Sequence, residues 1–214
     1  MTPSITPIHL GLTKYSEAVE KQLHYHELAK TTDQNFCLFV EHPPVITIGK
    51  NASMEDLNVD ASWLKKNNID LEKTTRGGKL TVHEPGQLVV YPILRVRDFS
   101  LGARTLIEAL TKVTVETFKD HGLKTYGKED PAGVWVGEKE KIASIGIRIS
   151  NRVSYHGIAI NLSNDMNTFR LITPCGLTNV SMTTFKKQTG HDMKLKNFSD
   201  VFFGHLTKTL EMSV

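Results

Sequence analysis

The chain has 214 residues, of which 39% are hydrophobic and 23% are charged. These values are ordinary for a soluble globular protein and exclude a disordered or fibrous chain. The formal net charge of +3 is too small to indicate nucleic-acid binding, and no apolar run approaches the roughly 20 residues of a membrane helix.

The N-terminus and the cysteines indicate a cellular compartment. Residues 1–12 lack a basic stretch followed by an apolar run, so they do not resemble a secretory signal. Cys37 and Cys175 lie far apart and form no disulfide framework, which favours a reducing environment. We therefore expect a cytoplasmic protein with no membrane or nucleic-acid partner.

The first elements are a helix and two strands. Apolar residues at helical spacing predict an amphipathic helix over residues 13–30, with Thr13 as its N-cap. Short apolar runs at 36–40 and 45–48 predict two strands, and Pro43-Pro44 joins them at a rigid corner.

The middle of the chain contains a strand between two helical patterns. Residues 62–68 predict a short helix, and residues 88–94 predict a strand that Pro92 places at a sheet edge or at a bulge. The longest helical pattern covers residues 101–121, and Gly122 ends it.

The pattern then becomes strand-like before a last helix. Strands are predicted at 133–136, 141–150 and 153–162, and Asn151-Arg152 predicts a hairpin turn between the last two. A final helix is expected from an N-cap at Ser199 to residue 212. The mixture predicts an α+β fold, a mixed β-sheet flanked by helices.

The C-terminal part is locally basic, with Lys186, Lys187, Lys194 and Lys196 close together. Surface charge mostly serves solubility, so a solvated surface is the favoured interpretation. A docking surface for an acidic partner is the alternative.

Four segments contain residues that a hydrophobic core alone does not explain. They are residues 76–87, 141–146, 156–161 and 172–177. The first is glycine-rich and basic, which is typical of a backbone that approaches a ligand closely, or of an ordinary hairpin. Taken alone, the lysine of the second segment fits a solvent-facing strand end, and the histidine of the third fits a hydrogen-bonded core residue.

The fourth segment contains Cys175 between a proline and a glycine. Most cysteines are small buried apolar residues, and Cys37, inside an apolar run, fits that description. Cys175 fits it poorly, because its neighbours indicate a turn in which a thiol faces a cleft.

Together these segments resemble the octanoyltransferases of lipoate synthesis. The resemblance rests on EHPPVITIGK, RGGKLTVHEPGQLVVYPI, GVWVGEKEKIASIGIRI, YHGIAINL and ITPCGL, in this order and spacing between about Phe36 and Leu177. It implies the fold of the biotin and lipoate protein ligases, a mixed sheet flanked by helices, in a single catalytic domain over residues 1–214.

The resemblance also implies roles for individual residues. Cys175 matches the acyl-accepting cysteine of the family, and Lys141 matches the lysine beside it. The residues that match segments lining the acyl pocket are Arg76, Gly77, Gly78, Lys79, Leu80, Thr81, Val82, His83, Ser144, Ile145, Gly146, Gly157, Ile158 and Ala159.

Two positions need attention. Glu84 replaces the first glycine of the family's His-Gly-Pro-Gly-Gln, so a turn residue free to take positive φ now carries a carboxylate. Lys139 and Lys141 are two residues apart, and an ideal strand directs both to the same face. The register of the motif selects Lys141.

The implied reaction is an ATP-independent acyl transfer. Octanoyl-acyl carrier protein is the expected donor, and lipoyl domains of 2-oxoacid dehydrogenases and the glycine cleavage H protein are the expected acceptors. Cys175 attacks the thioester, and an acceptor lysine then attacks the acyl-enzyme. Backbone N–H groups of Gly77, Gly78 and Gly176 are candidates for the oxyanion site. We expect no cofactor and no metal; His24 and His26, for example, have no cysteine nearby.

Three other functions are consistent with parts of this pattern. An ATP-using lipoate or biotin ligase shares the implied fold, but it gives Cys175 no role. Amidotransfer between lipoyl-domain proteins uses the same cysteine chemistry with a different donor. A non-catalytic acyl-carrier-binding protein is the third, with Glu84 marking lost activity.

Overall fold

Two β-sheets organise the chain, whose computed structural model describes residues 3–173 and 180–212. The larger sheet has eight strands in the order β1-β2-β6-β10-β9-β8-β7, and β11 pairs with β9. Most neighbours are antiparallel, whereas β1–β2 and β9–β11 are parallel. The strands are β1 Ile5–Leu12, β2 Asn35–Glu41, β6 Gln87–Ile93, β7 Tyr126–Glu129, β8 Ala132–Val136, β9 Glu140–Ser150, β10 Val153–Asn161 and β11 Ser181–Met182.

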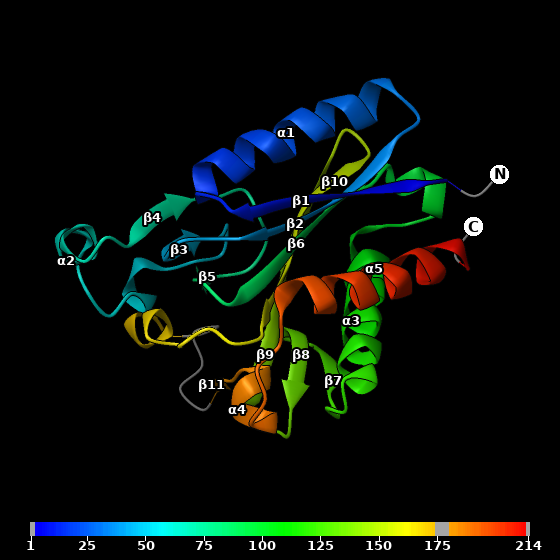
Figure 1. Cartoon of the computed structure of the whole chain (residues 1–214). Helices are drawn as coiled ribbons and strands as arrows, with labels where there is room; N and C mark the ends of the chain where they lie inside the picture. The colour runs from blue at the N-terminus through cyan, green and yellow to red at the C-terminus, as the bar shows by residue number, and fades with distance from the viewer. Residues whose placement is uncertain (1–2, 174–179, 213–214) are drawn as a thin grey trace.

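The smaller sheet has the order β4-β3-β5 and lies on the left of Figure 1 together with α2. Its strands are β4 Asp70–Lys73, β3 Val45–Ile48 and β5 Leu80–His83, and α2 spans Ala61–Lys66. Its apolar side chains pack with Leu64 of α2 and Phe169 into a separate core cluster.

Helices cover both faces of the larger sheet (Figure 1). Helix α1 (Tyr15–Thr31) covers one face, while α3 (Ala103–Asp120) and α5 (Leu195–Glu211) cover the other. The main core lies between the sheet and the latter pair. Shorter elements are α4 Phe185–Thr189 and the 3₁₀ turns η1 Met54–Asp56, η2 Val96–Phe99 and η3 Thr168–Leu171. This architecture confirms the predicted α+β class.

The turn predictions hold where the backbone requires an unusual conformation. Asn151 and Arg152 both have positive φ, 49° and 65°, as the two-residue hairpin turn between β9 and β10 demands. Gly122 follows α3 with φ of 79° and ends it as expected.

The edge position predicted for residues 88–94 is wrong, because β6 lies in the middle of the sheet between β2 and β10. Pro92 is tolerated there because the pairing with β10 ends at Val90, before the proline. The carbonyl oxygen of Pro92 instead accepts a hydrogen bond from Ser154 Oγ at 2.7 Å.

Both predicted N-caps are also wrong. Thr13 donates its Oγ1 hydrogen to Leu10 O and its N–H to Glu41 O, and α1 starts two residues later. Ser199 lies inside α5, where its hydroxyl donates to Lys196 O at 2.9 Å. Strand β1 was not predicted, because its pattern lacks strict alternation of apolar and polar residues.

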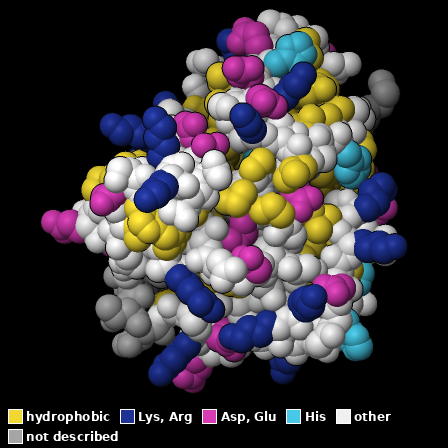
Figure 2. Space-filling view, turned by 60° about the vertical axis from the view of Figure 1, so that its left-hand side comes forward, with side chains coloured by type: hydrophobic (Ala, Val, Ile, Leu, Met, Phe, Trp, Pro, Cys, Tyr) yellow, Lys and Arg dark blue, Asp and Glu magenta, His cyan; other side chains and the backbone are white. Residues whose placement is uncertain are grey.

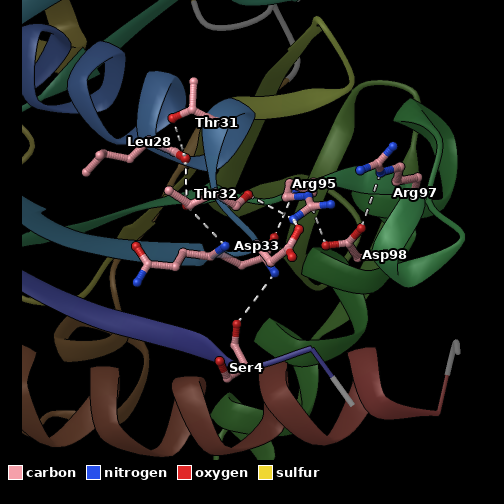
Figure 3. A network of polar contacts seen from close by, with 10 residues as sticks. Ser4, Leu28, Thr31, Thr32, Asp33, Arg95, Arg97 and Asp98 are labelled. Carbon is pink, nitrogen blue, oxygen red and sulfur yellow. Dashed lines mark hydrogen bonds and ion pairs between the residues drawn. The ribbon is translucent and has the colours of Figure 1, made fainter. Parts of the chain in front are cut away.

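A polar network around Arg95 joins the end of α1, the start of β2 and η2 (Figure 3). The guanidinium donates to Thr32 O at 2.8 Å and forms ion pairs with Asp33 and Asp98. Its backbone N–H donates to Asn35 Oδ1 at 2.8 Å. The network ties the C-terminal end of α1 to the start of β2 and to the chain that follows β6.

Within the part of the chain that the structure describes, no helix is both long and apolar enough to span a bilayer. Lys186, Lys187 and Lys196 form ion pairs with Asp192, Glu140 and Asp200 respectively. Figure 2 likewise shows basic and acidic side chains interspersed on one face of the molecule. The solvated-surface interpretation of the basic C-terminal part therefore fits better than a docking surface.

Candidate active site

A cavity of about 480 Å³ lies where the two sheets meet. Its wall is built from the turn at residues 76–79, from β5, and from the facing parts of β6, β9 and β10. Its volume falls within the roughly 300–1,000 Å³ of typical small-molecule sites. The cavity thus joins residues that lie far apart in the sequence, from Tyr15 to Ala159.

Nearly every residue predicted to bind the acyl group lines this cavity. Lys141 lies in its wall, together with Arg76, Gly77, Gly78, Lys79, Leu80, Thr81, His83, Ser144, Ile145, Gly146, Gly157, Ile158 and Ala159. Val82 is the exception, since it is fully buried in the core of the smaller sheet. Alternation along β5 directs Val82 to the face opposite Thr81 and His83, which both line the cavity.

Arg76 holds the glycine-rich turn against the smaller sheet. Its Nη2 donates to Thr47 O at 2.7 Å and to Thr47 Oγ1 at 2.9 Å, and its Nε donates to the same hydroxyl. Its Nη1 donates to Gly77 O at 3.0 Å. The guanidinium is therefore a structural clamp as well as part of the cavity wall.

His83 is neutral and fixed in one tautomer. Burial lowers the pKa of His83 well below its usual value, with further lowering from His42 and Arg76. Its Nδ1 lies 2.7 Å from Gln87 Oε1, and because that oxygen only accepts, Nδ1 carries the hydrogen. Because His83 resists protonation, it is a poor general base for removing a proton from an ammonium group.

His156 is equally unsuited to general-base catalysis. Burial, together with the charges of Arg76 and Arg148, lowers the pKa of His156 to about 4. Its Nε2 lies 3.0 Å from Thr75 Oγ1, and its backbone N–H donates to Gln22 Oε1. This environment resembles the hydrogen-bonded core histidine considered from the sequence, although the ring also borders the cavity.

Lys141 is 2% exposed and lies at the start of β9. The register against β8 shifts between Val134 and Trp135, and the Lys141 Nζ lies 5.5 Å from the centre of the Trp135 ring. Lys139 precedes the strand and is exposed, so the two lysines do not share a face. Of Lys139 and Lys141, the structure therefore places only Lys141 in the cavity wall.

Cys175 lies outside the described residues, but the chain on both sides of residues 174–179 is anchored. Before it, the N–H of Thr173 donates to Asp56 O at 2.8 Å. After it, β11 pairs in parallel with β9, with Met182 opposite Lys141. The N–H of Thr183 then donates to Lys141 O at 2.9 Å.

Cys37, the other cysteine, is fully buried in β2. Burial raises the pKa of its thiol well above the usual range, which removes thiolate at neutral pH. Cys37 is therefore a structural residue.

The backbone donors proposed for the oxyanion are only partly available. The N–H of Gly77 donates to Ile147 O at 3.2 Å, so it is committed to the backbone of β9. Gly78 remains a candidate, and Gly176 lies outside the described residues.

Several residues of the cavity wall are not among the binding residues predicted from the sequence. They include Tyr15, Asn51, Tyr91, Ala103, Ile107 and the loop 130–132. Tyr15 stacks on His83 with ring centres 5.8 Å apart, and burial raises the pKa of Tyr15 to about 12. Tyr91 donates to His42 Nε2 at 2.8 Å, since burial keeps the pKa of Tyr91 well above 10.

The described part of the cavity wall offers apolar side chains, a buried lysine and backbone groups to a ligand. Among the described residues, no group of three or more His, Cys, Asp or Glu side chains is arranged to hold a metal ion. The cavity instead combines apolar walls with a buried lysine and a clamped glycine-rich turn.

Residues 13–207 match the model of the lipoyl protein ligase A/B catalytic domain. An octanoyltransferase from Nitratidesulfovibrio vulgaris (strain DSM 19637 / Miyazaki F) is 40% identical over 186 residues, which cover 86% of this chain and 84% of that protein. The chain belongs to the octanoyltransferase family. It is an acyltransferase, and its chemistry concerns protein lipoylation.

Solved structures of more distant proteins share the fold of this octanoyltransferase-family chain. A bipartite lipoate protein ligase from Thermoplasma acidophilum superposes with a TM-score of 0.72 at 17% identity, covering 97% of this chain and 84% of that one. A biotin protein ligase from Aquifex aeolicus, in complex with biotin and ATP, gives 0.60 at 15% identity, covering 96% and 70%. The predicted ligase-like fold is confirmed.

Proposed function

We propose that this enzyme transfers an octanoyl group from octanoyl-acyl carrier protein to Cys175, and from there to a lysine of a lipoyl domain. Lipoyl domains of 2-oxoacid dehydrogenases and the glycine cleavage H protein are the proposed acceptors, in the cytoplasm. Family membership supports the acyl group, because the relatives are named octanoyltransferases. The reaction uses no ATP, because the donor thioester is already activated.

One observation carries this proposal: Lys141 is buried in the cavity wall, and the chain that leaves the Cys175 segment pairs with the strand that bears it. On the other side of that segment, Asp56 accepts from Thr173 and forms a 3.6 Å ion pair with Lys79 of the glycine-rich turn. Each anchor contacts a residue of the cavity wall, Lys141 or Lys79, which supports a thiol that acts there together with Lys141.

In the first half-reaction, the Cys175 thiolate attacks the thioester carbonyl of the donor. The C–S bond to the carrier breaks, and its thiolate takes a proton from the Lys141 ammonium and leaves as a thiol. A free thiol with a pKa of about 8.5 is only a few per cent thiolate at pH 7, so a neighbouring ammonium raises the reactive fraction. The products are an acyl-enzyme and a neutral Lys141.

In the second half-reaction, the acceptor amine attacks the Cys175 thioester. The acceptor lysine, with a pKa of about 10.4, must first lose a proton to solvent. The tetrahedral intermediate then gives a second proton to Lys141, an amide forms, and Cys175 leaves as thiolate. A neutral lysine is a credible base here because Lys141 is buried and has lost its thiolate counter-charge.

The cavity walls account for a preference for a medium-length acyl chain. Ile145 and Ile158 line the cavity, and both also contact the main core. At about 0.8 kcal/mol per buried CH₂, an octanoyl tail gains roughly 5 kcal/mol over an acetyl group. We expect acetyl carriers to be poor donors.

An ATP-using ligase is the alternative, since the Thermoplasma and Aquifex ligases share the fold. It predicts adenylate formation from free octanoate, with no covalent adduct on the enzyme. The identity of 40% to an octanoyltransferase and a lysine buried beside the Cys175 segment favour the transferase.

The test is intact-protein mass spectrometry after brief incubation with octanoyl-acyl carrier protein. The wild-type enzyme and Cys37→Ala are expected to gain one octanoyl group that hydroxylamine removes, whereas Cys175→Ser is not expected to form a thioester. The absence of an adduct on folded wild-type enzyme, with ATP-dependent octanoylation of a lipoyl domain, would establish the ligase instead.

A further inference from the structure

The carboxylate of Glu84 is buried, with 3% of the residue exposed, and both of its oxygens accept hydrogen bonds. Its Oε1 accepts from Asn164 Nδ2 and from the N–H of Met166, both at 2.9 Å. Its Oε2 accepts from the N–H of Thr168 at 3.2 Å. Within the described parts of the chain, no Lys, Arg or His side chain forms an ion pair with Glu84.

The segment that receives these bonds adopts a conformation that needs support. Met166 has φ of 67°, in the left-handed region that side chains other than glycine rarely occupy. Such backbone persists where surrounding contacts hold it, and the bond from Met166 N–H to Glu84 is one of them. Glu84 itself is not among the described residues with positive φ, so the replacement of glycine adds no strain.

Backbone contacts next to Glu84 strengthen the junction. Gly86 O accepts from the N–H of Ser163 at 3.0 Å. Gly86 has φ of 88°, and a Cβ there would lie 2.6 Å from the backbone nitrogen of Asn164. The turn after β5 thus packs directly against the backbone of residues 163–164.

The segment continues from this junction to the last described residues before Cys175. Thr168 starts η3, and Leu171 O at its end accepts from Asn58 N at 2.8 Å. Leu57 and Ile172 form an antiparallel bridge, and Thr173 then binds Asp56. In Figure 1 this segment is the yellow turn below β5.

In the other direction, hydrogen bonds connect Glu84 to the cavity wall. Asn164 Nδ2 also donates to Asn161 Oδ1 at 3.3 Å, and Gln87 Nε2 donates to the same oxygen at 2.9 Å. Gln87 in turn accepts from His83. A continuous polar network therefore joins the wall of the cavity to the start of η3.

We propose that Glu84 is a positioning residue, whose carboxylate sets the conformation of residues 164–173, the chain that leads to Cys175, and thereby the rate at which Cys175 is acylated. The second part rests on the proposed function, because it takes Cys175 as the acyl carrier. The glycine found in the resembling motif has no side chain and cannot make these three bonds. This chain therefore holds residues 164–168 with contacts that a glycine at position 84 cannot supply.

The first test needs no substrate and measures amide hydrogen exchange in wild type, Glu84→Gln and Glu84→Gly. Glutamine keeps one acceptor oxygen but places an NH₂ group where the other was. We expect Glu84→Gln to accelerate exchange of one amide, Thr168 or Met166, by roughly tenfold to a hundredfold, and Glu84→Gly to accelerate both. Glu55→Gln, which changes an exposed glutamate in η1, is the matched control and leaves both unchanged.

The second test measures acyl-enzyme formation by the same variants in single-turnover experiments. We expect the maximal rate to fall about tenfold in Glu84→Gln and further in Glu84→Gly, with a smaller change in the donor concentration at half-maximal rate. That split indicates a misplaced nucleophile rather than a weakened pocket.

The outcomes separate the two proposals. Unchanged exchange at Met166 and Thr168 in folded Glu84→Gly would overturn the positioning role. Faster exchange with a wild-type rate of acyl-enzyme formation would overturn its link to Cys175. Failure of the proposed function shows instead as no adduct on the wild-type enzyme, whatever the exchange pattern.

Discussion

The side chain of Lys141 crosses directly over the α-carbon of Gly133 on the neighbouring strand. A Cβ at position 133 would overlap both the backbone oxygen of Ala143 and Lys141 Cε, and would approach Lys141 Nζ to 3.1 Å; Gly133 has φ of 155°. Because Gly133 O and N belong to β8, the backbone cannot retreat without breaking its pairing with β9. The absence of a side chain at Gly133 therefore leaves the space that the buried Lys141 side chain occupies.

Gly133→Ala is expected to displace Lys141 and to lower the rate of acyl transfer at least tenfold. Relief of overlap in a packed interior, here with both the β9 backbone and Lys141, costs about 1–3 kcal/mol, so the variant should also melt earlier. Rates and melting temperatures are compared with Gly204→Ala, where no atom lies within 4 Å of the added carbon. Wild-type rates in Gly133→Ala would show that the position of Lys141 does not limit catalysis.

Lys141→Met should impair the second half-reaction most, because the variant removes the proposed base. A positioned general base typically contributes 10²–10⁴-fold, so transfer from isolated acyl-enzyme to a lipoyl domain should slow by about that factor. The control is Lys139→Met, which changes an exposed lysine two residues earlier. Acyl-enzyme of Lys141→Met that transfers octanoate at the wild-type rate would refute the role as base.

Arg76→Lys is expected to loosen the glycine-rich turn despite the retained charge. Lysine cannot reproduce the paired hydrogen bonds to Thr47 O and Oγ1, so we expect a loss of about 1–3 kcal/mol in the free energy of unfolding. Urea unfolding of this variant, of Thr47→Val and of the double variant measures the coupling energy between Arg76 and Thr47. Additive losses of unfolding free energy in the double variant would contradict a direct clamp. The control is Arg104→Lys, which changes a residue of an exposed ion pair.

The free energy of unfolding should fall as the pH drops from 7.5 to 5.5. Burial lowers the pKa of His42 to about 4, against about 6.5 in the unfolded chain, so in this range the unfolded state binds more protons. His42 alone contributes a loss of about 1 kcal/mol over this interval, and His156 acts in the same direction.

His42→Gln should flatten this pH dependence by about that amount in urea unfolding at the two pH values. His191→Gln, which changes an exposed histidine, should leave it unaltered. Equal slopes in wild type and His42→Gln would show that His42 is not held neutral by the fold.

The local elements were largely predictable because their causes are local. The helical period of residues 101–121, the positive-φ hairpin at Asn151-Arg152 and the apolar runs at 36–40 and 45–48 each reflect neighbouring residues. Errors arose where a distant partner decided the outcome. Thr13 bonds to Glu41 instead of capping a helix, and β6 is central because β2 and β10 pair with it from both sides.

The candidate site shows the same division. The motifs named Lys141 and most of the cavity wall, but they did not show that Lys139 precedes the strand or that Val82 points away. Tyr15 and Ile107 joined the wall only through packing of α1 and α3. The roles of Cys175 and of the binding residues, like the single domain over residues 1–214, stay predictions.

The sequence by itself determined the family, the fold class and the chemical types of group at the site. Motif order and local periodicity depend on residues that are close together in the sequence. Only the tertiary structure decided which lysine is buried, which histidines are held neutral and what Glu84 binds. Burial and hydrogen-bond partners depend on residues far apart in the chain: Glu84 meets Thr168, eighty-four positions away, only once the sheets have formed.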